Sequence, residues 1–354
     1  MKKIIAFLML LIGCSSVLAS EIKQMVFFGD SLTDSGNLYK YVLHILPKSP
    51  PYFQGRFTNG PTWAENVGKY YHDKYNIEYK VYAVGGATAV FHKPTNEFVT
   101  LATLELEVNH YLLKSLFSNK SKTLYGIWIG GNDYFFDQTS EPNQITTDVV
   151  NSIMWAIATL ADRGGENFLI LNMPDLSRTP FLKNEEYSKR LHTLSISHNQ
   201  KLAAAIADLE KTHPNIKIYT VDIYNIFNNV IDNTEQFNKK YNAHITDTTQ
   251  SCWGGGYILK DTLSEQTLTS EIQRDMLKTN GKLSNEVDAQ EIARYIRSSP
   301  VLAMTYNMGK LYMSGILPCS DADAYLFWDQ IHPTQAVHQV LSKVVIEKLA
   351  SNVL

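Results

Sequence analysis

Short apolar runs alternate with stretches of helical periodicity, and this alternation constrains the fold more than any other feature of the chain. The runs cover residues 26–28, 81–84, 124–129, 168–171 and 216–221, and each is bounded by Gly, Asn, Asp or Pro, which is typical of buried strands. Apolar residues at helical spacing fill three of the gaps: Leu101, Leu104, Val108, Leu112 and Leu116; Ile145, Val149, Ile153, Ile157 and Leu160; and Leu191, Leu194, Leu202, Ile206 and Leu209. With right-handed crossovers, this βαβ series predicts an α/β fold with a parallel sheet of about five strands and helices on both faces. A final helix over 337–349 is expected to close it.

Two stretches interrupt the pattern. Residues 47–61 are rich in Pro and aromatic residues, and they predict either a loop near a functional site or a structural surface loop. Residues 233–324 are polar, contain three glycines at 254–256 and show no clear sheet strand before helical spacing returns over 277–296. We interpret them as an insertion in one elaborated domain over 20–354, because 354 residues with 44% apolar content can form one large core.

The N-terminus has the pattern of a targeting segment. Lys2 and Lys3 precede an apolar run over 4–12 that is too short to span a bilayer, which predicts a signal peptide over 1–19, cut before Ser20. The alternative is a lipoprotein signal in which Cys14 carries lipid. Either route predicts a secreted or periplasmic protein of a Gram-negative bacterium and leaves Cys252 and Cys319 as a pair in an oxidising compartment, where a disulfide is expected.

Charge and ligand patterns argue against several classes of function. Lys and Arg total 32 against 35 for Asp and Glu, so the net charge of −3 offers no basic field for nucleic acid. The sequence contains no His-Glu-x-x-His motif and no paired-cysteine spacing. We therefore expect no nucleic-acid partner, no metal and no cofactor.

Reactive residues recur at the ends of predicted strands and ahead of the final helix. Ser31 follows the first strand, Gly86 the second and Asn132 the third, while Asp329 and His332 precede the last helix. Carboxyl ends of parallel strands share one edge of the sheet, so these residues could meet there as nucleophile, backbone donor, amide donor and base. Each motif alone is equally compatible with a turn or a helix cap.

Taken in order, the four motifs resemble the SGNH (GDSL) hydrolase family. They are Gly-Asp-Ser-Leu at 29–32, the turn at Gly86, Gly-Gly-Asn-Asp at 130–133 and Asp-x-x-His at 329–332. Further stretches at 55–63, 172–176, 198–199 and 327–334 resemble the branch of secreted bacterial phospholipases and glycerophospholipid:cholesterol acyltransferases. The resemblance covers nearly the whole mature chain and is weakest over 233–318.

The resemblance implies a flavodoxin-like SGNH-hydrolase fold, a three-layer α/β/α sandwich. It implies that Ser31 attacks an ester carbonyl, that His332 is the base and that Asp329 orients the imidazole. The oxyanion donors would be the Ser31 and Gly86 N–H groups and the Asn132 amide. The absence of Gly-x-Ser-x-Gly around Ser31 argues against an α/β-hydrolase.

The implied activity is hydrolysis of phospholipid or lysophospholipid acyl esters at a membrane or micelle surface. Tyr52, Phe53, Phe57 and Phe135 are expected to contact a long acyl chain; a short-chain or carbohydrate esterase is the alternative. Water or a sterol could accept the acyl group. The disulfide-bounded insertion is expected either to act as a lid that a processing protease cuts or to be purely structural.

Overall fold

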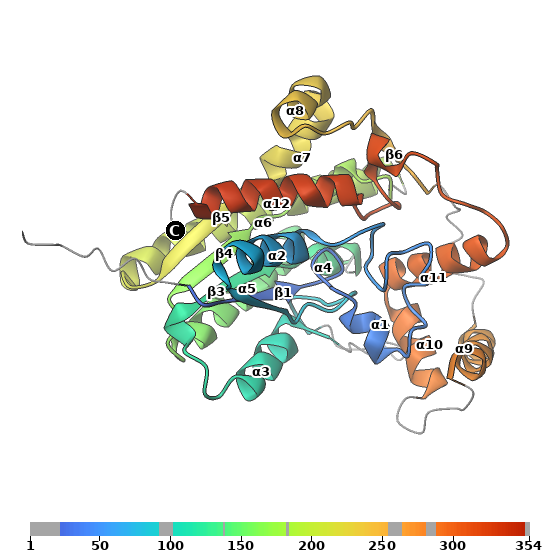
Figure 1. The fold of residues 1–354 in the computed structure, drawn as a ribbon, viewed down its shortest axis with the longest axis horizontal. Helices are drawn as coiled ribbons and strands as arrows, with labels where there is room; N and C mark the ends of the chain where they lie inside the picture. Colours follow the sequence, from blue (N-terminus) through green and yellow to red (C-terminus); the bar gives the residue numbers. More distant parts are fainter. Residues whose placement is uncertain are drawn as a thin grey trace, which may run out of the picture.

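The computed structural model describes residues 22–91, 102–136, 139–181, 184–253, 264–280 and 288–350. The predicted signal peptide over 1–19, including Cys14, and the three glycines at 254–256 lie outside these ranges. Within the described ranges, no helix combines the length and apolar character that crossing a membrane requires. Figure 1 shows the fold coloured along the chain.

A five-stranded parallel sheet forms the centre of the molecule, as predicted. Its spatial order is β2–β1–β3–β4–β5, and the strands are β1 (Gln24–Gly29), β2 (Glu78–Val81), β3 (Thr123–Trp128), β4 (Asn167–Leu171) and β5 (Lys217–Val221). Strands β3 and β4 are buried at every residue, because helices cover both faces of the sheet. All neighbouring strands run parallel, so the carboxyl ends of β1 and β3 lie at the same edge.

The predicted position of the second strand was wrong. We expected it over 81–84, whereas β2 spans Glu78–Val81. As an edge strand it alternates exposed and half-buried residues, so it has no continuous apolar run for the sequence to reveal. The segment that follows still runs beside β1, since Tyr82 N–H donates to the carbonyl of Phe27 at 2.8 Å.

Two apolar cores lie on opposite faces of the sheet, because successive side chains of a strand point to opposite faces. Val26 and Phe28 belong to the core under α3 (Leu104–Lys114), α5 (Pro142–Ala161) and α6 (Glu185–Thr212). Met25 and Phe27 belong to the core under α2 (Trp63–Tyr75), α7 (Ile223–Asp232) and α12 (Gln335–Ala350). In Figure 1, α2 and α12 lie on one side of the sheet and α3 on the other. The predicted three-layer α/β/α arrangement is therefore confirmed.

The helical stripes predicted α5 and α12 well but α3 only in part. Every marked residue of α5 is buried, and α12 includes the whole of 337–349. Helix α3 ends at Lys114, and Leu116 beyond it is 68% exposed. Its inward face carries Glu107 as well as Leu104 and Val108. The remaining short elements are α1 (Asn37–Tyr41), η1 (Lys120–Lys122), α4 (Gly131–Phe136), η2 (Leu176–Arg178) and η3 (Ala322–Ala324).

The insertion contains a strand that the sequence did not reveal. Strand β6 (Asp247–Ser251) pairs in parallel with β7 (Tyr325–Phe327) in a separate two-stranded sheet, and its Asp-Thr-Thr-Gln-Ser sequence has no apolar signal. Of the expected helical stretch over 277–296, residues 277–280 belong to one helix and residues 289–296 to another, and residues 281–287 lie outside the described ranges. The helices of the insertion are α8 (Thr234–Tyr241), α9 (Glu265–Asn280), α10 (Ala289–Ser298) and α11 (Pro300–Met313).

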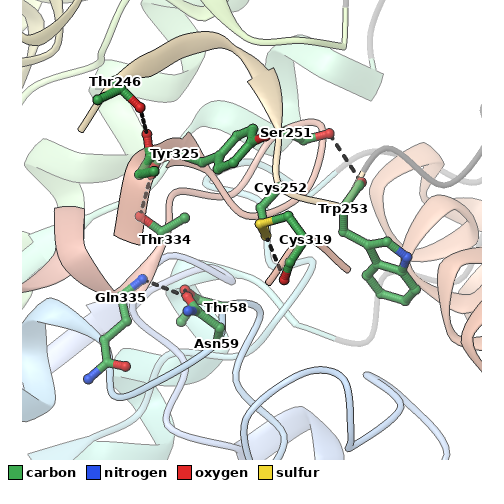
Figure 2. The surroundings of a disulfide bond; sticks show 11 residues. Thr58, Asn59, Thr246, Ser251, Cys252, Trp253, Cys319, Tyr325, Thr334 and Gln335 are labelled. Carbon is green, nitrogen blue, oxygen red and sulfur yellow. Dashed lines mark hydrogen bonds between the residues drawn. A yellow bond between two sulfur atoms is a disulfide. The ribbon is translucent and has the colours of Figure 1, made fainter. Parts of the chain in front are cut away.

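The expected disulfide joins Cys252, directly after β6, to Cys319, ahead of β7 (Figure 2). Cys319 N–H donates to the carbonyl of Cys252 at 2.9 Å, and Cys252 N–H donates to the carbonyl of Phe327 at 2.9 Å. The bond closes a loop of 67 residues, which would stabilise the fold by roughly 4 kcal/mol on chain-entropy grounds. It therefore fixes the insertion beside the segment that carries Asp329 and His332.

A buried histidine in the α2–α12 layer gives the fold a pH dependence that can be tested. Trp63 N–H donates to His338 Nδ1 at 3.1 Å, and burial lowers the pKa of His338 to about 3. The folded state thus binds fewer protons than the unfolded state, so this histidine stabilises the protein fully above about pH 6.5, and its contribution falls as the pH drops.

His338→Asn keeps an acceptor for Trp63 but cannot be protonated. We expect its melting temperature to fall less than that of the wild type between about pH 7 and about pH 5, measured by calorimetry. His213→Asn, at an exposed histidine, should keep the wild-type slope. An equal slope in His338→Asn and the wild type would show that His338 does not contribute to this pH dependence.

Candidate active site

The loop after β1 presents Ser31 at the carboxyl edge of the sheet, as predicted. A Cβ at Gly29 would lie 2.3 Å from the carbonyl oxygen of Trp128, so only glycine allows β1 and β3 to approach so closely before the turn. The Asp30 carbonyl accepts hydrogen bonds from Thr33 N–H at 3.0 Å and Asp34 N–H at 2.9 Å. The tight turn that results holds Ser31 with only 5% of its surface exposed.

The Asp34 carboxylate holds the rest of this loop. It accepts four backbone N–H groups, those of Gly36 (2.8 Å), Asn37 (2.6 Å), Leu38 (3.1 Å) and Gly85 (2.7 Å). Burial raises the pKa of Asp34 to about 6, although these hydrogen bonds oppose the rise. The Gly85 contact links the loop after β1 to the loop after β2, so one carboxylate sets the spacing of two segments.

Ser31, His332 and Asp329 form a continuous chain of hydrogen bonds. His332 Nε2 lies 2.8 Å from Ser31 Oγ, and His332 Nδ1 lies 2.8 Å from Asp329 Oδ2. Burial by itself would raise the pKa of Asp329, but the neighbouring His332 and the backbone N–H groups of Ile331 and His332 bring that pKa below its ordinary value. An ionised carboxylate, an imidazole and a hydroxyl in this order can move a proton from the hydroxyl to the imidazole.

Asn132 and Ser31 line the same cleft, whereas Gly86 is covered by the insertion. Asn132, on α4 directly after β3, donates one N–H of its amide to the carbonyl of Ala87 at 2.8 Å. Gly86 has φ +81°, and a Cβ there would lie 2.9 Å from Leu302 of α11 and 3.1 Å from the hydroxyl of Tyr295 of α10. Tyr295 also donates to the carbonyl of Gly85 at 2.8 Å. The Gly86 turn thus meets Asn132 through Ala87 and meets α10 and α11 on its other side.

The cleft beside Ser31 is mostly apolar. It lies between the loops after β1, β3 and β4, helix α7 and the segment after β7. Its apolar lining comprises Leu32, Trp128, Ile129, Phe135, Met173, Pro174, Leu176, Phe227, Ile231, Phe327, Ile331 and Pro333. Such a surface can hold a hydrocarbon chain next to the serine hydroxyl.

The expectation that the aromatic residues of 47–61 line this cleft was wrong. Phe135 does line it, but Tyr52 and Phe57 are buried behind the hydrogen-bond chain. The Tyr52 hydroxyl donates to Asp329, and the ring of Phe57 lies 5.2 Å from that of His332. Phe53 instead packs under the guanidinium of Arg56. The loop is near the site, as one of the two interpretations predicted, and it supports the site from behind.

Two buried acids shape the site in ways that the sequence analysis did not predict: it did not single out Glu107, and it gave no role to Asp133 of the Gly-Gly-Asn-Asp motif. Glu107 accepts Gly29 N–H at 2.9 Å and Val84 N–H at 3.0 Å, and burial raises its pKa well above the ordinary value. The Asp133 carboxylate accepts the N–H groups of Ala89 at 2.8 Å and of Val90 at 3.0 Å. The sequence does contain one indication for Glu107: this acid falls within the apolar stripe of α3, which faces the core.

Asp30, next to Ser31, is also buried in the cleft wall. Burial raises its pKa to about 7, while the Leu32 N–H bond and the charge of His332 oppose that rise. In the part of the chain that the structure describes, no three His, Cys, Asp or Glu side chains gather as ligands for a metal ion.

The chain matches a known protein family along most of its length. The family model described as GDSL-like Lipase/Acylhydrolase matches residues 25–345. The chain is 29% identical over 327 residues to a phosphatidylcholine-sterol acyltransferase of Aeromonas hydrophila, which covers 90% of this chain and 88% of that protein. It is 32% identical over 202 residues to the secreted effector protein SseJ of Salmonella typhimurium, covering 56% and 46% respectively. Among solved structures, the acetylxylan esterase Axe2 of Geobacillus stearothermophilus superposes with a TM-score of 0.41 and 12% sequence identity. The superposition covers 94% of this chain and 96% of the Axe2 chain.

The role of Glu107 in holding the end of β1 and the loop after β2 predicts a loss of stability in Glu107→Gln. A glutamine presents one carbonyl and one amide, so one of the two buried N–H groups would lose its acceptor. We expect the free energy of unfolding to fall by about 2 kcal/mol, measured by urea denaturation. Glu105→Gln, at an exposed residue of the same helix, should change it little. Equal stability of both variants would contradict the role given to Glu107.

Proposed function

Because this chain belongs to the GDSL-like lipase/acylhydrolase family and is an ester hydrolase of that family, we propose that it cleaves acyl esters of phospholipids and lysophospholipids. The observation that carries the proposal is the apolar cleft that leads to Ser31. A long acyl chain buries its methylene groups in such a cleft, whereas an acetyl group would leave most of it filled with water. A short-chain or carbohydrate esterase is the alternative that the substrate experiment below distinguishes.

In the proposed mechanism, Ser31 Oγ attacks the ester carbonyl while His332 Nε2 accepts its proton. His332 then gives this proton to the leaving alcohol, and the serine is left as an acyl-enzyme. Asp329 stays ionised, accepts a hydrogen bond from the Nδ1–H of His332 and stabilises the imidazolium. The distances of 2.8 Å along this chain of hydrogen bonds support these roles.

The negative charge on the tetrahedral intermediate needs donors in the cleft. We propose the Ser31 N–H, the Gly86 N–H and the second N–H of the Asn132 amide for this role. The position of Asn132 beside Ser31 supports its part. Leu302 and Tyr295 of the disulfide-bounded insertion lie against Gly86, and we propose that this insertion acts as a lid that a protease can release.

We also propose that a sterol, besides water, can accept the acyl group from the enzyme. The Aeromonas relative is named a phosphatidylcholine-sterol acyltransferase, and a sterol hydroxyl would attack the acyl-enzyme from the same face as water. A lipid substrate implies work at a membrane or micelle surface. The predicted signal peptide and the relative named a secreted effector support secretion or export to the periplasm.

The proposed nucleophile and base are tested by substitution. Ser31→Ala and His332→Ala should each lower kcat by about 10⁶-fold without unfolding the protein, because each removes a group on which the other depends. Ser314→Ala, at an exposed serine, should keep full activity. A serine-reactive phosphonate followed by mass spectrometry should label Ser31 alone. Labelling at another serine, or activity in Ser31→Ala, would exclude this assignment.

The proposed substrate is tested with acyl-radiolabelled phosphatidylcholine and lysophosphatidylcholine, each with and without cholesterol. Fatty acid release should increase with chain length, each buried methylene contributing up to ~0.8 kcal/mol, and labelled cholesteryl ester should form when cholesterol is present. A parallel sample cut by a protease between Cys252 and Cys319 should gain more activity on the lipid than on a small soluble ester. Faster cleavage of acetylated sugars than of either lipid would overturn the lipid proposal, and parallel changes on both esters would overturn the lid.

A further inference from the structure

The Tyr52 side chain adds a fourth group to the chain of hydrogen bonds that starts at Ser31. Tyr52 Oη donates to Asp329 Oδ2 at 2.8 Å, the oxygen that also faces His332 Nδ1 at 2.8 Å. The other oxygen, Oδ1, accepts the N–H groups of Ile331 at 2.9 Å and His332 at 2.8 Å. The Asp329 carboxylate, which has no exposed surface, is thus surrounded by donors from the backbone, an imidazole and a phenol.

The position of Tyr52 is fixed by its packing. Only 1% of its surface is exposed, and its ring contacts those of Phe57, Trp253 and Trp328. Trp253 directly follows Cys252 of the disulfide, and its indole points away from that bond toward the insertion helices in Figure 2. A phenol held on several sides by aromatic rings has little rotational freedom to lose when it donates to Asp329.

We propose that Tyr52 is a positioning residue for the reaction: its hydroxyl fixes the Asp329 carboxylate, spreads part of its charge and thereby sets the orientation and basicity of His332. The inference rests on the proposed function and deepens it. Tyr52 touches no reacting atom in this scheme and acts through Asp329 alone.

The sign of the effect follows from electrostatics. Without the phenol donor, more of the Asp329 charge would act on His332, and the imidazolium form would gain stability relative to the neutral base. The enzyme would then lose its active neutral histidine at a higher pH than the wild type does. Among the described residues, Asp30 in the loop after β1 and His338 on α12 also interact electrostatically with His332. Asp30 and His338 are present in the wild type and in a Tyr52 variant alike. A difference between the pH profiles of these two proteins therefore measures the effect of Tyr52.

The test is Tyr52→Phe, which keeps the ring and removes only the hydroxyl. On a soluble ester we expect kcat to fall about 10-fold with KM within about twofold, as for loss of a hydrogen bond to a charged group. The acid limb of the pH profile of kcat/KM should move up by about half a pH unit. Tyr71→Phe is the matched control, since Tyr71 is equally buried and its hydroxyl donates to the Ile346 carbonyl between α2 and α12. It should leave kcat and the pH profile unchanged.

A second substitution should shift the acid limb in the opposite direction while keeping the phenol in place. Site-specific 3-fluorotyrosine at position 52 is a more acidic phenol and a stronger donor, so it should move the acid limb to lower pH. A wild-type profile in both Tyr52 variants would overturn the inference. The inference would also be overturned if Tyr52→Phe lost activity only in proportion to a lower melting temperature, with no shift in the acid limb of its pH profile. Failure of the proposed function is distinguishable, because it would appear as activity that survives Ser31→Ala whatever the state of Tyr52.

Discussion

Hydrogen bonds from backbone N–H groups to buried carboxylates hold the carboxyl edge of the sheet, and the site depends on them. Asp34 joins the loop after β1 to the loop after β2, Glu107 joins the end of β1 to Val84 in the loop after β2, and Asp133 holds the chain beyond Gly86. A buried N–H needs an acceptor and a buried carboxylate needs donors, so each of these hydrogen bonds satisfies both groups. Loops held in this way keep their shape without a regular ladder of hydrogen bonds.

Asp329 differs from these acids in the partner that it meets. Burial raises the pKa of Asp34 and of Glu107, and backbone donors only partly oppose this. Asp329 is buried just as deeply, yet its pKa is lowered because an imidazole that can carry charge lies at hydrogen-bond distance. The same residue class therefore serves as scaffold in one place and as an ionised partner of His332 in another.

The insertion contacts the site at two separate points. Tyr295 and Leu302 pack on the Gly85–Gly86 turn, and Trp253 packs on Tyr52 behind Asp329. Between these points, the disulfide and the β6–β7 pairing tie the insertion to the chain that carries Asp329 and His332. A movement of the insertion would therefore alter the packing of the Gly85–Gly86 turn and the support of Asp329 together.

The sequence by itself determined the parallel sheet, its flanking helices, the Cys252–Cys319 pair and the set of reactive residues, because apolar periodicity and strand-end motifs are local properties. It misplaced β2 and missed β6, whose sequences carry no apolar run. Only the tertiary structure decided that Glu107 turns inward to the end of β1 and the loop after β2, that Tyr52 lies behind Asp329 rather than in the cleft, and that Gly86 is covered by α10 and α11. The physical reason is that these contacts join residues far apart in the chain, and their geometry exists only once the layers have packed.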